Sequence, residues 1–376
     1  MKSHHASGSN AINPLAKCIS DAFSQRVLAT EIGKIDTRLS SVAKPFHYVI
    51  RTIFMFVLGL DIGYSNVKLA FGDHLAPPTT KLFPAGAAPI EHLPQAIDRA
   101  SDTLRVTLDG VAWGAGISVS KLSNWNRALH QDYTNTSSYR ALLYAALLAS
   151  ERSVIDVLVT GLPVSQWQER SARQALTNQL KGVHQITPKR QVAVEQVHVV
   201  PQPTGAFVEQ LFTTQDRRLS NGRVLVIDPG YFSVDWVLLN EGEIVSASSG
   251  TSLEAMSVLL DKTSELICDD HGGKLTPEKI EDALRSGSSN VLLLGQEIIL
   301  QDYLAAAAQS ISMIALEAMK QSLRREKGSV DIVLLAGGGA SLYQNATKEF
   351  FPLNPIFTPS QPTLANALGF FYFGRG

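Results

Sequence analysis

The sequence predicts an α/β protein built from two related halves, and two observations carry this prediction. From Met55 onwards, short β-rich apolar runs alternate with stretches of helical periodicity, which indicates layered sheets and helices. In addition, one block occurs twice: an apolar run ends in an acid, a glycine turn follows, and a second β run returns. The two acids, Asp61 and Asp228, lie 167 positions apart, so we expect each half to open with such a hairpin.

Length and composition limit the class of protein. The chain has 376 residues, 45% hydrophobic and 18% charged, which is typical of a globular protein with length for two or three domains. A net charge of −1 gives no general attraction to nucleic acid or to an anionic membrane, so we expect neither as a direct partner. The two cysteines offer neither a disulfide framework nor a metal-ligand spacing, which suits the reducing cytoplasm.

Residues 1–54 differ from the rest of the chain. They are weakly periodic and carry a net charge of +4, whereas the remainder carries −5. Met55 stands directly before the first predicted strand. We therefore expect the folded part to begin near residue 55 and residues 1–54 to be an N-terminal extension of uncertain order, with a basic docking tail as an alternative.

In the first half, apolar periodicity predicts alternating strands and helices. The predicted strands are 56–62, 66–73, 154–164 and 191–200, and the predicted helices are 89–101, 137–151, 165–182 and 204–216. The run over 154–164 is almost continuously apolar, which is typical of a strand buried on both faces. Ser165 follows its closing turn and is the expected N-cap of the next helix.

The second half follows the same pattern. The predicted strands are 222–230, 232–239, 243–250 and 331–336, and the predicted helices are 252–272, 275–286, roughly 297–325, one after the glycines at 337–339, and one within 361–373. Thr276 and Pro277 are the expected N-cap and first residue of the helix over 275–286.

The two acids indicate a site for a hydrated cation. A carboxylate at the end of a buried strand is costly unless a partner compensates it, although a turn-capping aspartate is the simpler interpretation of Asp61 alone. Two such carboxylates facing each other across a cleft could hold the hydration shell of one Mg²⁺, which keeps several waters beside phosphate oxygens. We therefore expect Asp61 and Asp228 to bind Mg²⁺ through water.

The residues after each acid have the composition of phosphate-binding turns. Gly63 and Gly230 allow backbone N–H groups to approach phosphates closely. Side-chain donors could come from Ser65, Asn66 and Ser233, and positive charge from Lys68, for which a surface lysine is an equal alternative. A further glycine run, Gly337, Gly338 and Gly339, lies where a strand meets a helix and permits flat contact with a ligand. Neither the Walker pattern nor G-x-G-x-x-G occurs.

In order and spacing, these three blocks resemble the phosphate-one, phosphate-two and adenosine motifs of the actin, DnaK-type chaperone and sugar-kinase superfamily. The nearest likeness is to the ParM/StbA-type plasmid-partitioning actins, and it runs from about residue 55 to the C-terminus. Ser360, Gln361 and Asn366 extend the likeness into the closing segment. The resemblance implies two RNase H-like α/β domains flanking a nucleotide cleft. The implied divisions are 55–205 for domain I, 206–359 for domain II and 360–376 for a segment that returns to domain I.

The resemblance also implies the site residues. The first phosphate hairpin would contribute Asp61, Gly63, Tyr64, Ser65, Asn66 and Lys68, the second would contribute Asp228, Gly230, Tyr231, Ser233 and Asp235, and the adenosine would contact Gly337, Gly338 and Gly339. Gln202 falls where ParM relatives carry a catalytic Glu, and it would orient the attacking water, with Asp61 and Asp228 as the other catalytic residues. Tyr231 and Phe232 depart from the usual small turn and Pro229 removes one N–H, which leaves the hydrolysis rate and the choice between ATP and GTP open.

The function implied by the resemblance is that of a slow, Mg²⁺-dependent ATPase that forms nucleotide-dependent filaments. Such filaments segregate plasmid DNA in the cytoplasm through a DNA-binding adaptor at a centromere-like site. Two alternatives remain open: a small-molecule kinase of the same fold, which needs an additional Asp as base, and a nucleotide-binding scaffold that does not hydrolyse. A DnaK-like chaperone is not expected, because no substrate domain follows residue 376.

Overall fold

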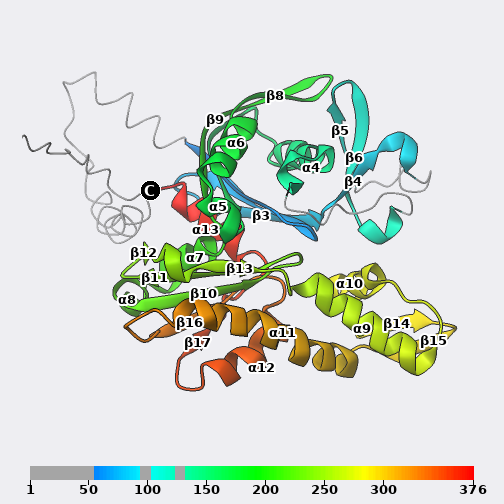
Figure 1. The fold of residues 1–376 in the computed structure, drawn as a ribbon. Coiled ribbons are helices and arrows are strands. Elements are labelled where there is room, and N and C mark those ends of the chain that lie inside the picture. Colours follow the sequence, from blue (N-terminus) through cyan, green and yellow to red (C-terminus); the bar gives the residue numbers. More distant parts are fainter. Residues whose placement is uncertain (1–54, 94–102, 123–131) are drawn as a thin grey trace, which may run out of the picture.

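Two mixed sheets organise the described part of the chain, which in this computed structural model comprises residues 55–93, 103–122 and 132–376. The first sheet has the order β3-β2-β1-β7-β9-β8 and contains β1 (Phe56–Ile62), β2 (Asn66–Asp73), β3 (Thr79–Pro84), β7 (Val154–Leu162), β8 (Gly182–Thr187) and β9 (Arg190–Pro201). The second has the order β12-β11-β10-β16-β17 and contains β10 (Arg223–Pro229), β11 (Val234–Asn240), β12 (Glu243–Ile244), β16 (Ile332–Leu335) and β17 (Ile356–Phe357), with β13 (Gly250–Ser252) beside β11. We call the elements from β1 to β9 the first lobe and those from β10 to β17 the second lobe (Figure 1).

Both sheets are built around the same three-stranded unit. In the first lobe β1 pairs antiparallel with β2 and parallel with β7, and in the second β10 pairs antiparallel with β11 and parallel with β16. Asp61 lies opposite Lys68 in the first hairpin, and Asp228 lies opposite Asp235 in the second. The predicted repetition of a hairpin that contains an acid is therefore present in the structure.

Each lobe has its own hydrophobic core. In the first lobe, α4 (Ser137–Ala149) packs on β1 and β2, and its N-terminus is capped by the Thr136 side chain, which accepts a bond from the N–H of Tyr139. In the second lobe, α9 (Met256–His271), α11 (Gln301–Leu323) and α12 (Ala340–Phe350) cover β10, β11 and β16. None of the helices in the described ranges is long and apolar enough to cross a membrane.

Two helices connect the lobes through an unusually close crossing. α7 (Thr204–Thr214) follows β9, and α13 (Ala365–Phe373) packs on β1 and β7 of the first lobe. A Cβ atom added to Gly369 would lie 1.7 Å from the carbonyl oxygen of Gly205, so the two backbones meet with no side chain between them. Only glycine at position 369 permits this approach.

The structure differs from the predicted elements in residues 86–117. In place of the start of a helix over 89–101, residues Gly86–Pro89 form β4 and Ile90–His92 form a 3₁₀ turn, and the rest of that predicted helix, 94–101, lies outside the described residues. β4 pairs with β6 (Val111–Ile117), which in turn pairs with β5 (Leu104–Leu108). β4 and β6 are rich in Gly and Ala, so they carry little of the alternation that marks a strand, whereas β5 alternates but has only five residues.

The predicted helix over 165–182 is two helices, α5 (Val164–Gln168) and α6 (Arg170–Leu180), with an extended residue at Glu169 between them. The prediction that Ser165 is the N-cap was wrong, because the helix begins at Val164, one residue earlier. Its first two N–H groups instead donate to side chains of the second lobe, Val164 to Asp235 at 2.7 Å and Ser165 to Thr251 at 3.0 Å. Capping by residues so distant in sequence leaves no local signal.

Two helix starts in the second lobe lie later than predicted. A hairpin of β14 (Asn290–Leu293) and β15 (Gln296–Ile299) precedes α11, which begins at residue 301 and not near 297. α9 begins at Met256, since residues 250–252 belong to β13. The helix α10 (Pro277–Ser286) does start with proline as predicted, although Thr276 makes no side-chain capping bond. The remaining elements, α8 (Arg217–Asn221), β3, β8 and β17, had no clear signal.

Glu209 on α7 generates a prediction about pH and stability. It is 4% exposed, its Oε2 atom has no hydrogen-bond partner among the described residues, and burial raises its pKa to about 7. An acid whose pKa is higher in the folded than in the unfolded chain stabilises the fold only while protonated, so stability should fall as pH rises from about 4.5 to 7.

We therefore expect Glu209→Gln to be more stable than the parent by about 3 kcal/mol at pH 8 and to show little difference at pH 4.5. Urea unfolding at both pH values measures this. Glu349→Gln, at an exposed position on α12, is the matched control and should leave stability unchanged. If the stability of Glu209→Gln changed with pH in the same way as that of the parent, the raised pKa of Glu209 would be contradicted.

Candidate functional site

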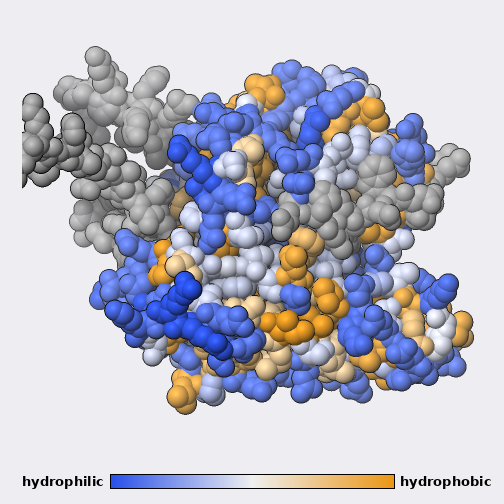
Figure 2. Space-filling model, viewed as in Figure 1, coloured by the Kyte–Doolittle hydropathy of each residue, from blue (hydrophilic) through white to orange (hydrophobic). Residues whose placement is uncertain are grey.

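A cavity of about 490 Å³ lies between the lobes. Both acid hairpins, the β7–α5 turn, the β9–α7 turn, α10 and the glycine turn before α12 form its walls. In Figure 2 the band between the lobes is mostly neutral to apolar in hydropathy, with hydrophilic residues gathered on the outer surfaces. Every site residue expected from the sequence lines this cavity, namely Asp61, Gly63, Tyr64, Ser65, Asn66, Lys68, Gln202, Asp228, Gly230, Tyr231, Ser233, Asp235, Gly337, Gly338 and Gly339.

Asp61 is a buried carboxylate with two compensating partners. It is 4% exposed, and its Oδ2 atom accepts a hydrogen bond from the Lys68 ammonium group at 3.0 Å. Its Oδ1 atom accepts a bond from Nε2 of Gln202, also at 3.0 Å. The Lys68 side chain is only 15% exposed, so the alternative of a surface lysine is wrong. Lys68 provides the charge that makes burial of Asp61 tolerable.

Asp228 occupies the corresponding place in the second lobe. It is 5% exposed and accepts a bond from Nδ2 of Asn366 at 2.6 Å. Burial raises its pKa to about 7; the bond from Asn366 opposes this, and the nearby charge of Asp61 adds to it. Gly337 has a φ of +82°, and a Cβ there would lie 2.1 Å from Oδ1 of Asp228. The first glycine of the triple run is therefore required by the acid beside it.

The cavity is lined by four carboxylates, Asp61, Asp228, Asp235 and Glu281, but by only two cations in the described ranges, Lys68 and Arg285, so it has a deficit of positive charge. Among the described residues no group of three or more His, Cys, Asp or Glu side chains could ligate a metal directly. The donor set instead fits a cation that retains most of its water, as Mg²⁺ does. Asp61 and Asp228 are the residues that could hold it.

Asp235 lines the cavity, but the protein uses both of its oxygens. Oδ1 accepts bonds from the N–H of Val164 and the hydroxyl of Thr251, at 2.7 and 2.6 Å, and Oδ2 accepts one from the hydroxyl of Ser233 at 2.6 Å. The carboxylate therefore caps α5 of the first lobe from β11 of the second. It is a link between the lobes, and it also occupies the Ser233 hydroxyl expected to face phosphate.

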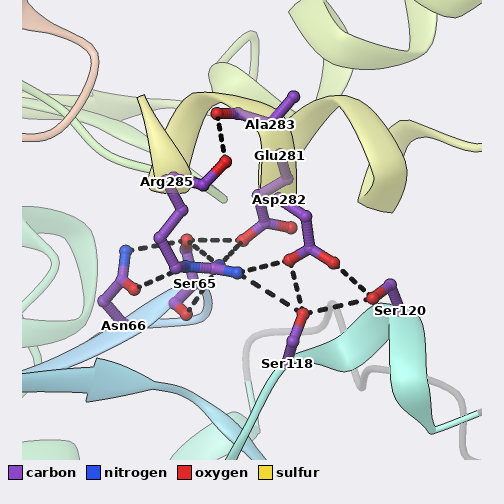
Figure 3. Close-up of polar contacts among 9 residues, drawn as sticks. Ser65, Asn66, Ser118, Ser120, Glu281, Asp282, Ala283 and Arg285 are labelled. Carbon is purple, nitrogen blue, oxygen red and sulfur yellow. Dashed lines mark hydrogen bonds and ion pairs between the residues drawn. The ribbon is translucent and has the colours of Figure 1, made fainter. Parts of the chain in front are cut away.

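The helix α10, which contributes Glu281, Leu284 and Arg285 to the lining of the cavity, also bonds the first lobe, as Figure 3 shows. The Ser65 hydroxyl donates to Glu281 at 2.5 Å, and Nε of Arg285 donates to the Asn66 side chain at 3.1 Å. Arg285 also pairs with Asp282, which accepts bonds from the Ser118 and Ser120 hydroxyls. We call this set the polar latch; its members are Ser65, Asn66, Ser118, Ser120, Glu281, Asp282 and Arg285. The side chains of Ser65 and Asn66, expected at phosphates, are bonded to α10 in this structure.

Several cavity residues lie in no motif of the sequence. They include Tyr133, Tyr139, Met256, Leu260, Glu281, Leu284 and Arg285. Glu281 and Arg285 stand four apart, a spacing that predicts an ion pair along a helix but says nothing of what lies opposite. Asn366 belongs to the closing segment noted in the sequence, yet its contact with Asp228 follows only from the packing of α13.

Comparisons with known proteins identify the family. The model for the N-terminal domain of actin-like proteins matches residues 59–205, and the model for the C-terminal domain of archaeal MreB-like actin homologues matches residues 226–349. Each match contains one acid hairpin. No curated protein matches the sequence.

Solved structures agree with these matches. The archaeal actin homologue Ta0583 is similar with a TM-score of 0.69 and 21% identity, over 84% of this chain and 98% of that chain. Its complex with ADP gives a TM-score of 0.66 at 21% identity, over 84% and 98%. A ParM filament from Clostridium botulinum gives 0.65 at 20% identity, over 86% and 99%. The chain therefore belongs to the actin-like proteins, and it has the fold of the ParM-type actins that the sequence resembles.

Proposed function

We propose that this protein is a slow ATPase that binds ATP with Mg²⁺ between its lobes and assembles into filaments. The observation that carries the proposal is the pair of buried carboxylates, one from each acid hairpin, in a single cavity. The N–H groups of Gly63 and Gly230 close their own turns, so the N–H groups of the residues that follow them would contact the phosphates, and Gly337, Gly338 and Gly339 would contact the adenosine. Bound Mg²⁺ would neutralise the terminal phosphates. GTP remains an alternative to ATP, because none of these contacts selects a base.

We propose that Gln202 orients the attacking water. Its backbone N–H donates to the carbonyl of Leu162 at 2.9 Å, and its own carbonyl accepts from Gly205 at 3.1 Å, so the turn after β9 is fixed on both sides. Its side chain bonds Asp61, the expected neighbour of the metal. A carboxamide cannot accept a proton near neutral pH, so it acts on water by position alone, and we expect slow turnover.

For Gln202→Ala we expect ATP hydrolysis about 10–100-fold slower, with ATP affinity changed less than about threefold, because the residue would act on water and not on the bound phosphates. Phosphate release at saturating ATP and Mg²⁺ measures the rate, and equilibrium binding measures the affinity. Gln174→Ala on the exposed face of α6 is the control. Hydrolysis at the parental rate in Gln202→Ala would remove the residue from the mechanism.

Filament formation is proposed from the fold, since a ParM of similar fold has been solved as a filament. A role in plasmid segregation in the cytoplasm would require a DNA-binding adaptor at a centromere-like site. The near-neutral net charge is consistent with a filament that does not bind DNA or membrane directly.

We expect ATP with Mg²⁺ to produce reversible assembly, detected by light scattering and sedimentation, and Asp228→Asn to prevent it because the hydrated metal loses a carboxylate. Protein that stays monomeric at high concentration with bound ATP contradicts the filament proposal and favours a scaffold without turnover. ATP consumption that depends on an added sugar or acid favours a kinase instead.

From the polar latch we derive a prediction about the rate of nucleotide release. Asp282→Ala removes the contacts to Ser118, Ser120 and Arg285 but leaves both acid hairpins intact. We expect release of a fluorescent ATP analogue to become about fivefold faster, since a partly exposed ionic network contributes up to about 1 kcal/mol. Asp109→Ala, which breaks an exposed ion pair with Arg140 inside the first lobe, is the control. Equal release rates for Asp282→Ala and the parent would exclude the latch as a barrier.

A further inference from the structure

The turns of the two acid hairpins touch through aromatic rings. The ring of Tyr64, in the first turn, lies 4.5 Å from that of Phe232, in the second, measured between centroids. On its other side Tyr64 stacks on Tyr133 at 4.3 Å, and Tyr133 meets Tyr139 edge to face at 5.4 Å. We call these four residues the aromatic bridge. It runs from α4 in the first lobe to the β10–β11 turn in the second.

The first-lobe end of the aromatic bridge is held by packed elements. Tyr139 and Tyr133 are buried, and Tyr139 stands in the capped first turn of α4. The Tyr133 hydroxyl donates to the carbonyl of Gly63 at 3.4 Å, which ties the row of rings to the first hairpin turn itself. Tyr64 therefore packs on Tyr133 of the first lobe and contacts Phe232 of the second.

The second-lobe end is also fixed. The N–H of Gly230 closes the turn on the carbonyl of Ser233 at 2.8 Å. The carbonyls of Gly230 and Tyr231 accept bonds from the N–H groups of Met256 and Ser257, at 3.2 and 2.8 Å, so the start of α9 holds the turn. Phe232 therefore projects from a turn that cannot shift without moving α9.

We propose that Tyr64 and Phe232 are positioning residues, whose contact sets the separation of the two phosphate turns. Both turns must face one phosphate chain at the same time, and a small residue at position 232 could not reach across to Tyr64. Ring pairs at this distance stabilise an arrangement by an amount equivalent to about three- to tenfold in an equilibrium. The consequence for nucleotide rests on the proposed function, whereas the contact between the lobes does not.

The first test uses the full chain without nucleotide. In Phe232→Ala we expect backbone amides of residues 63–66, in the opposite lobe, to exchange hydrogen about three- to tenfold faster. In Tyr64→Ala the same should hold for residues 230–233. Phe232→Leu, which keeps an apolar side chain but no ring, should fall between Phe232→Ala and the parent. Phe350→Ala, at the end of α12, is the control for loss of an aromatic ring. Unchanged exchange at 63–66 in a folded Phe232→Ala protein overturns the proposal.

The second test is a double-mutant cycle on release of a fluorescent ATP analogue. Each single alanine variant should release it about three- to tenfold faster, and the double variant no faster than the more affected single variant, because one contact is lost in all three. Multiplying effects would mean that the rings act separately and would overturn the pairing. A parent that binds no ATP defeats the proposed function, while the exchange experiment still decides whether the rings couple the lobes.

Discussion

The need to compensate two buried carboxylates is the constraint on which this structure depends. Asp61 and Asp228 end strands that are otherwise apolar, and neither would be stable there alone. The solutions differ between the lobes. Asp61 receives a lysine and an amide, whereas Asp228 receives an amide alone from the described residues and has a raised pKa. Asp228 is thus the less compensated of the two acids, and a bound cation would offset the cost of its burial more than that of Asp61.

Three parts of the structure join the lobes: the crossing of α7 and α13, the surroundings of the two acids, and α10. At the base, α7 and α13 cross with backbone against backbone, and Asn366 of α13 bonds both Asp228 and the N–H of Ala206. Beside the acids, Asp235 caps a helix of the other lobe. Along another wall of the cavity, α10 bonds the first hairpin. Several residues that line the cavity, among them Ser65, Asp235 and Arg285, also join the lobes, so a ligand that contacts them acts on the contacts between the lobes as well.

The parts that could be predicted from the sequence are those with a local cause. The acid hairpins, the triple glycine and the proline at the start of α10 each follow from a few adjacent residues. The parts that could not be predicted depend on distant partners. The break between α5 and α6 accompanies caps from Asp235 and Thr251, and Glu281 faces Ser65 although 216 positions separate them. Asp235 shows that prediction is limited even within a motif. Its place in the second hairpin could be predicted from the sequence, but its hydrogen bond to Val164 could not.

The crossing of Gly205 and Gly369 has a mechanical consequence. No side chain separates the two backbones at the crossing, and beyond it the ring of Phe212 on α7 stacks on that of Tyr372 on α13 at 4.3 Å. The two helices therefore form one closely packed base, and a displacement between the lobes that leaves this base intact grows in amplitude with distance from it. The β5–β6 and β14–β15 hairpins lie at the ends of the lobes remote from α7 and α13 (Figure 1). A small rotation of one lobe relative to the other would therefore displace these two tips more than the residues beside the helix pair.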